Sequence, residues 1–118
     1  EPEANPKDSQ FSVVTSTSNL DNGNTIMNHK LKNNFPNPFN SSTIINYRIG
    51  KPGFVNISIY NIKGVKVVTL ENDYHASGNY RLRWNALDAN RNKISSGIYF
   101  VKLSTKNYIA TKKLLYAK

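Results

Sequence analysis

Cysteine is absent from the 118 residues of this chain, and tryptophan occurs once. Without cysteine there are no disulfide bonds, thiolate metal ligands or thiol nucleophiles, so the fold has to be stable through packing alone. Only two histidines, His29 and His75, and seven acidic residues could serve as acids, bases or metal ligands. Because that supply is too small for an obvious catalytic or metal-binding cluster, we expect no enzyme activity, no metal and no cofactor.

A long apolar run is also absent, so the sequence predicts no transmembrane helix. The N-terminus is polar and acidic, and it lacks the basic and then apolar pattern of a signal peptide. The first residue is Glu1 rather than methionine. We therefore expect the sequence to be a piece of a longer protein.

Acidic residues are scarce after residue 30, where only Glu71, Asp73 and Asp88 face 14 basic residues, a net charge of +11. A field of that size could attract nucleic acid, anionic lipid or anionic polysaccharide. The simpler interpretation is a solvated surface that keeps the domain soluble. Basic and aromatic residues do alternate in "YRLRW", but a strand with two different faces produces that pattern by default, and we predict no nucleic-acid binding.

Residues 1–30 consist mostly of Asn, Ser, Thr, Asp and Pro. Such a composition cannot bury enough apolar surface to offset the entropy lost on ordering. The sequence predicts a flexible linker here, in which "QFSVVTST" could be the remnant of a strand from a preceding domain. We place the domain itself at residues 31–118.

From Leu31 onward the sequence consists of short runs with a period of two, rich in Val, Ile, Tyr and Thr. Examples are "TIINYRI", "FVNISIYNI", "NYRLRWNA" and "GIYFVKLST", and turn sequences such as "GKPG", "NIKG" and "ASGN" separate them. Alternation of this kind predicts strands, and no segment shows a helical period. The sequence predicts an all-β, immunoglobulin-like antiparallel β-sandwich of about seven strands. We expect its core to include inward-facing residues of these runs: Tyr80, Leu82, Trp84 and Val101.

The stretch "FPNPFN", residues 35–40, precedes the first of these runs. Pro36 and Pro38 fix their own φ angles and favour extended conformations at the residues before them. Proline is tolerated in a strand only at an edge or at the start. We therefore expect this stretch to be the first edge strand, with Phe35 and Phe39 both inserting their rings into one end of the sandwich.

Five stretches together resemble the type A C-terminal sorting domain of the bacterial type IX secretion system. They are "LKNNFPNPFNSSTIINYRI", "VNISIYNIKGVKVVTL", "ASGNYRLRWNA", "SSGIYFVKLST" and the basic and apolar "TKKLLYAK". They occur in the order and at the spacing of that family, over about residues 31–118. The signal motifs that the resemblance assigns are Pro36, Asn37, Pro38 and Phe39 near the start, and Gly97, Ile98, Tyr99, Lys112, Lys113, Leu114 and Leu115 near the end.

The resemblance implies a non-catalytic domain that directs an upstream cargo domain through the outer-membrane translocon of Bacteroidetes and their relatives. The cargo would pass through the periplasm and reach the cell surface or the medium. A sortase-like protease would cleave the linker, and some cargoes of the family are attached to anionic lipopolysaccharide. The chain departs from the family pattern where Ala86 and Arg91 stand in place of glycines. If the position of Arg91 requires a positive φ, Arg91 is strained there or the turn differs.

Alternative interpretations remain for the motifs and for the whole domain. Tyr99 is expected to fill the core, which leaves the outward Phe100 and Lys102 for functional contacts. The lysines of the last strand either protect a sheet edge or take part in recognition, for instance by strand addition. Trp84 could belong to a carbohydrate-binding module, and the domain could instead be a structural spacer. The spacing Asp88-x-Asn90-x-Asn92 resembles the start of a calcium loop, but an Asx turn fits it better.

Overall fold

The computed structural model describes residues 28–118, and the predicted strand remnant in "QFSVVTST" lies outside them. The described part is all-β, and its strands are β1 (Lys30–Leu31), β2 (Thr43–Ile49), β3 (Gly53–Asn61), β4 (Lys66–His75), β5 (Gly78–Trp84), β6 (Gly97–Ser104) and β7 (Ile109–Tyr116). The strands begin and end at the predicted turns, because Gly, Pro and Asn in those turns end each alternating run.

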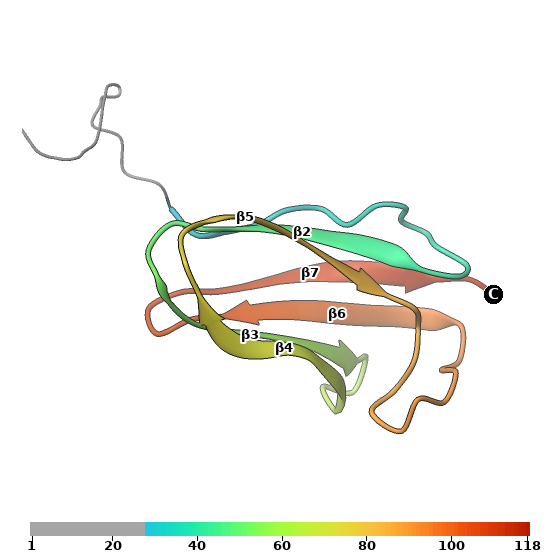
Figure 1. The fold of residues 1–118 in the computed structure, drawn as a ribbon. Helices are drawn as coiled ribbons and strands as arrows, with labels where there is room; N and C mark the ends of the chain where they lie inside the picture. The colour runs from blue at the N-terminus through green and yellow to red at the C-terminus, as the bar shows by residue number, and fades with distance from the viewer. Residues whose placement is uncertain (1–27) are drawn as a thin grey trace, which may run out of the picture.

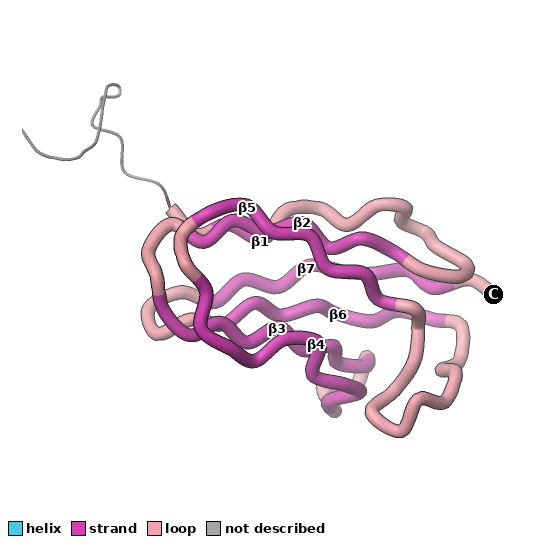
Figure 2. Tube along the Cα trace, viewed as in Figure 1, coloured by secondary structure: helices cyan, strands magenta, loops and turns pink. Residues whose placement is uncertain are grey.

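The strands form two antiparallel sheets that face each other across a common core (Figures 1 and 2). One sheet has three strands in the order β1-β2-β5, and the other has four in the order β4-β3-β6-β7. The arrangement confirms the predicted antiparallel β-sandwich of seven strands.

The core lies between the sheets and follows the predicted alternation. In β2 every second side chain, from Thr43 to Ile49, is buried, and the residues between them are less buried. In β3 and β6 the inward residues include Ile57 and Val101, which are almost fully buried. A period of two places alternate side chains on opposite faces, so one sequence pattern defines both the core and the surface.

The stretch before β2 differs from the prediction, because it crosses from one sheet to the other and forms no continuous strand. Phe35 makes an isolated bridge with Ile44 of β2, and Phe39 makes another with Tyr116 of β7. Phe39 is 2% exposed, whereas Phe35 is 75% exposed. The prediction that both rings insert into the sandwich is therefore wrong for Phe35.

A buried polar network explains why the chain turns outward at Phe35. Asn34 donates through its side-chain amide to the Thr43 hydroxyl (2.9 Å), and Thr43 donates to the Pro36 carbonyl (2.8 Å). These bonds hold the backbone of residues 34–36 against the start of β2. A buried polar side chain has to find such partners, and the ring between them is then left facing solvent.

Candidate recognition site at the terminal strand

The sequence motifs that lie far apart in the chain meet at one end of the sandwich. Phe39 packs on Trp84 (ring centroids 5.7 Å apart) and on Tyr116 (5.1 Å), and Trp84 meets Tyr99 edge-on (6.0 Å). All four rings are buried. Aromatic pairs at these separations add to the stability gained from burial alone, so the cluster fixes the start and the end of the domain against each other.

Asn37 and Phe39 bind the outer edge of β7. The Asn37 side chain accepts from the Leu115 backbone N–H (2.9 Å) and donates to the Lys113 carbonyl (3.3 Å). The backbone of Phe39 donates to the Leu115 carbonyl and accepts from the Ala117 N–H, both at 2.9 Å. Over 113–117 the edge of β7 is therefore already paired, and a partner strand could add there only by displacing residues 37–39.

Gly97, Ile98 and Tyr99 begin β6 and lie opposite the end of β7. Their partners across the ladder are Tyr116, Leu115 and Leu114. Tyr99 points inward, its hydroxyl donates to the Ser95 carbonyl (2.8 Å), and burial, with a smaller effect of Tyr116, raises the pKa of that hydroxyl. These residues hold the terminal strand in register.

The residues of the basic and apolar motif divide between the two faces of β7. Leu114 is fully buried, and Lys112 shares its face but remains half-buried; Lys113 and Leu115 point away from the core. The same alternation places Phe100 and Ile98 of β6 outward, beside Lys113 and Leu115. A shallow depression of about 280 Å³ continues this outer surface, and its lining includes Tyr60, Ile62, Phe100 and Lys102. We call Ile98, Phe100, Lys113 and Leu115 the outer patch.

The predicted core residues lie on the inner face to different extents. Trp84 and Val101 are buried, and the Trp84 indole donates to the Leu87 carbonyl (3.0 Å). Tyr80 and Leu82 are partly buried and pack against the core from β5, a strand at the sheet edge. An edge strand has a neighbour on one side only, which leaves its inward side chains less covered.

His75 ends β4, directly before the predicted turn "ASGN", and is 6% exposed. Its Nδ1 lies 3.2 Å from the Asp73 carbonyl, which can only accept, so Nδ1 donates to it. Its Nε2 is hydrogen-bonded to the Tyr47 hydroxyl at 2.9 Å. Burial, with smaller effects of Glu71 and Tyr80, raises the pKa of Tyr47 to about 12. In the sequence, His75 is a polar residue beside the turn "ASGN", and nothing local indicates that it is buried. Its burial depends on Tyr47, which is 28 residues away.

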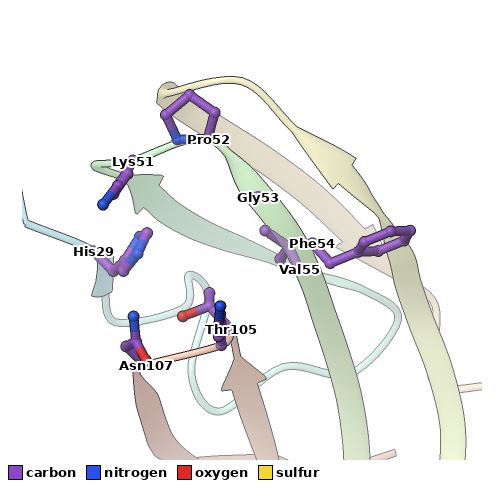
Figure 3. A pocket seen from close by; sticks show the side chains of 9 residues that line it. His29, Lys51, Pro52, Gly53, Phe54, Val55, Thr105 and Asn107 are labelled. Carbon is purple, nitrogen blue, oxygen red and sulfur yellow. The ribbon is translucent and has the colours of Figure 1, made fainter.

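A second cleft lies at the opposite end of the sandwich, where the β2–β3 and β6–β7 turns approach each other (Figure 3). It measures about 420 Å³, and its lining includes His29, Lys51 and Thr105. His29, which the sequence assigned to the linker, packs on Tyr108 (5.5 Å) and accepts from the Gly50 N–H (3.1 Å). The cleft is remote from the motifs and from the aromatic cluster.

The loop after β5 is an Asx turn. The Asp88 carboxylate accepts from the backbone N–H groups of Asn90 and Asn92, both at 2.9 Å, which is the geometry expected for a turn. Within residues 28–118 no group of three or more potential metal ligands occurs. The same residues contain no helix long and apolar enough to cross a membrane.

The described residues thus define a small β-sandwich in which two features join residues 37–39 to β7. One is the aromatic cluster around Phe39, and the other is the pair of Asn37 side-chain hydrogen bonds, which we call the Asn37 latch. The family model described as "Secretion system C-terminal sorting domain" matches residues 33–117. The chain belongs to this family, the type IX secretion C-terminal sorting domain, which confirms the resemblance.

Solved structures show the same fold. Dimeric latent PorU from Porphyromonas gingivalis is similar with a TM-score of 0.58 and 20% identity, and the match covers 75% of this chain and 9% of that one. PorZ, described as an essential surface component of the type IX secretion system of the same organism, has a TM-score of 0.50 and 18% identity; 75% of this chain and 11% of that chain are covered. This chain therefore spans about a tenth of either protein. No match was found among the curated proteins.

Proposed function

We propose that this domain directs a larger cargo protein across the outer membrane through the type IX secretion system. The observation that carries the proposal is the family match over residues 33–117, in a chain whose family motifs converge on one end of the fold. The cargo would cross the periplasm and arrive at the cell surface or in the medium. A sorting signal needs a surface that the translocon can recognise, and it needs no catalytic groups.

The outer patch is the surface that we assign to this recognition. Buried motif residues such as Phe39, Tyr99 and Leu114 hold the fold and are not accessible to a partner. Ile98 and Phe100 stand on the open face of the sheet, with Lys113 and Leu115 beside them across the ladder. Apolar side chains flanked by cations would suit a translocon surface that combines apolar and acidic groups.

The edge pairing of β7 favours recognition through this face over strand addition. Asn37 and Phe39 occupy the outward backbone groups of 113–117, and a partner strand would first have to break those four hydrogen bonds. Side chains of the outer patch are accessible without such a rearrangement. A face contact therefore needs no unfolding step.

Cleavage by a sortase-like protease would fall before the sandwich. Backbone hydrogen bonds hold Lys32, Phe35 and Phe39 to neighbouring strands, and proteases act on extended chain that can leave such ladders. We place the scissile bond before Lys30, where β1 begins. The cargo would then be released or attached to anionic lipopolysaccharide.

Substitutions on the outer patch test the proposal without disturbing the core. We expect Phe100→Ser with Leu115→Ser to reduce export of a fused cargo at least tenfold while the domain stays folded. The matched control is Phe54→Ser with Tyr74→Ser, an exposed aromatic pair on β3 and β4 of the same sheet. Unchanged export of the patch variant, or an equal loss in the control, would contradict the assignment of this surface.

The alternative of a carbohydrate-binding module loses the stacking residue that the sequence offered for it. It depended on Trp84 as a stacking platform for a sugar ring, and Trp84 is 2% exposed. A ring that is buried against Phe39 and Tyr99 cannot stack on a ligand.

A further inference from the structure

The outer face of the three-stranded sheet carries a flat array of cations. In β5, Arg81 and Arg83 point away from the core, and the register places them beside Asn46 and Ile44 of β2. One step along, Arg48 lies between Asn79 of β5 and Lys30 of β1. Three of the four arginines in the chain therefore share one face of three strands.

The strands β1, β2 and β5 carry no acidic side chain. The acidic residues within 28–118 are Glu71 and Asp73, on β4 of the other sheet, and Asp88, whose carboxylate is bound in its own turn. The arginine partners that the structure gives are neutral: Arg83 donates to the Ser42 hydroxyl (2.9 Å) and Arg48 to the Asn28 carbonyl (3.2 Å). These bonds orient two guanidinium groups, and within residues 28–118 neither group forms an ion pair with a carboxylate.

The geometry of the face separates the possible anionic partners. Side chains on one face repeat about every 7 Å along a strand and about every 5 Å between strands, so the cations form a planar grid. Surfaces that bind single-stranded nucleic acid normally provide aromatic rings on which the bases stack. None of the outward side chains of β1, β2 and β5 is aromatic. A planar, charge-dominated contact fits a planar array of phosphates.

An exposed apolar side chain, Phe35, lies beside the cations, as expected for a surface that binds a membrane. Phe35, which is 75% exposed, bridges to Ile44 at the border of the cationic grid. Surface-bound proteins combine cations, which attract anionic headgroups, with an apolar side chain that enters the boundary between headgroups and acyl chains. Guanidinium groups suit this role because they bind phosphate oxygens in pairs.

We call the outer face of β1, β2 and β5, with Lys30, Arg48, Arg81 and Arg83, the cationic face. We propose that the cationic face docks on the phosphate-bearing headgroups of an anionic lipid bilayer. The contact would hold the domain flat against a membrane while the outer patch, on the opposite sheet, stays accessible. The proposal goes beyond the sorting role and does not depend on it.

Vesicle co-sedimentation tests the proposal with the full chain. We expect binding to phosphatidylcholine vesicles that contain phosphatidylglycerol, weakening as salt is added, and no binding to phosphatidylcholine alone. Each cation removed should weaken partitioning about fivefold, so Arg48→Gln, Arg81→Gln and Arg83→Gln together should weaken it about a hundredfold. The lysine version of the same triple variant keeps the charge and should retain most of the binding.

The matched control removes the same net charge elsewhere, with Lys63→Gln, Lys66→Gln and Lys93→Gln, three exposed lysines outside the face. Retained binding in the control, combined with loss in the arginine variant, supports the proposal. Equal loss in both variants would show that only total charge matters and would overturn it. Failure of the native chain to bind the anionic vesicles would overturn it as well, including the case in which the chain binds a soluble sulfated polysaccharide instead.

Discussion

Two residues of the loop after β5 adopt a backbone conformation that glycine normally supplies. Ala86 has φ 59° and Arg91 has φ 66°, in the left-handed region. Both stand where the family pattern has glycine, and the sequence identified Arg91 as a position of possible strain. The sequence alone left open whether the turn would change or the strain would persist. In the structure the strained turn persists, because the Arg91 N–H donates to the Asp88 carbonyl and the Asn92 N–H donates to the Asp88 carboxylate.

Replacing Arg91 by glycine should therefore stabilise the domain. The left-handed conformation costs an L-residue about 1–2 kcal/mol, part of which is offset by the greater entropy of glycine in the unfolded chain. We expect Arg91→Gly to raise the free energy of unfolding by about 1 kcal/mol, measured by urea denaturation. Ala89→Gly in the same loop, at a residue without positive φ, should lower it by about 0.5–1 kcal/mol.

Tyr47 makes stability dependent on pH in the alkaline range. Burial raises its pKa from 10.0 to about 12, so the folded state retains a proton that the unfolded state loses. The stabilising contribution is complete below pH 10 and is lost as pH rises toward 12. We expect Tyr47→Phe to be less stable near neutral pH, because its bond to His75 is lost, and to show a shallower alkaline decline. Thermal denaturation of the native protein and of Tyr47→Phe between about pH 9 and pH 12 measures this difference. An equally steep loss of stability with pH in both proteins would contradict this account.

The strands were predictable because each depends on a local pattern, whereas the segment before β2 depends on distant partners. The alternation in "TIINYRI" is enough to define β2 and its buried face. By contrast, the bonds of Asn37 go to residues 76 and 78 positions away, and nothing in "FPNPFN" identifies them. The same dependence on β7 explains why Phe39 is buried.

The latch that Asn37 forms on β7 should contribute measurably to the order of the terminal strand. Asn37→Ala removes one acceptor and one donor from the strand edge. We expect a loss of about 1 kcal/mol in unfolding free energy and faster hydrogen exchange at the Leu115 amide. Asn40→Ala, an exposed neighbour in the same loop, is the control and should leave that amide unchanged. Unaltered hydrogen exchange at the Leu115 amide in the Asn37 variant would contradict this prediction. The backbone hydrogen bonds of Phe39 would then be enough to keep the end of β7 ordered.

Gly97 begins β6 with φ 155°, a conformation that side chains rarely adopt, although a Cβ atom there would meet no neighbour. The penalty for Gly97→Ala is therefore backbone strain and not steric crowding. We expect a loss of about 2 kcal/mol in unfolding free energy. Gly53→Ala starts a strand with equal space and no positive φ, and it should be close to neutral. Similar losses in both variants would argue against strain at Gly97.

At the scale of the whole molecule, the proposed recognition surface and the proposed membrane surface lie on different sheets. Buried aromatic rings at one end join the first and last segments, the outer patch lies on the four-stranded sheet, and the cationic face lies on the three-stranded sheet. The sequence supplied the motifs and the net charge of its second part. Only the register of β2 and β5 shows that three arginines share one plane.

Localisation of a fusion protein tests the central claim most directly. Residues 28–118 would be fused behind a fluorescent protein with an inner-membrane leader, in a bacterium with a type IX system and in its translocon-null mutant. The account predicts fluorescence outside the wild-type cells and in the periplasm of the mutant. Retention in the periplasm of both strains, while a native cargo of that bacterium is exported normally, would contradict the sorting role.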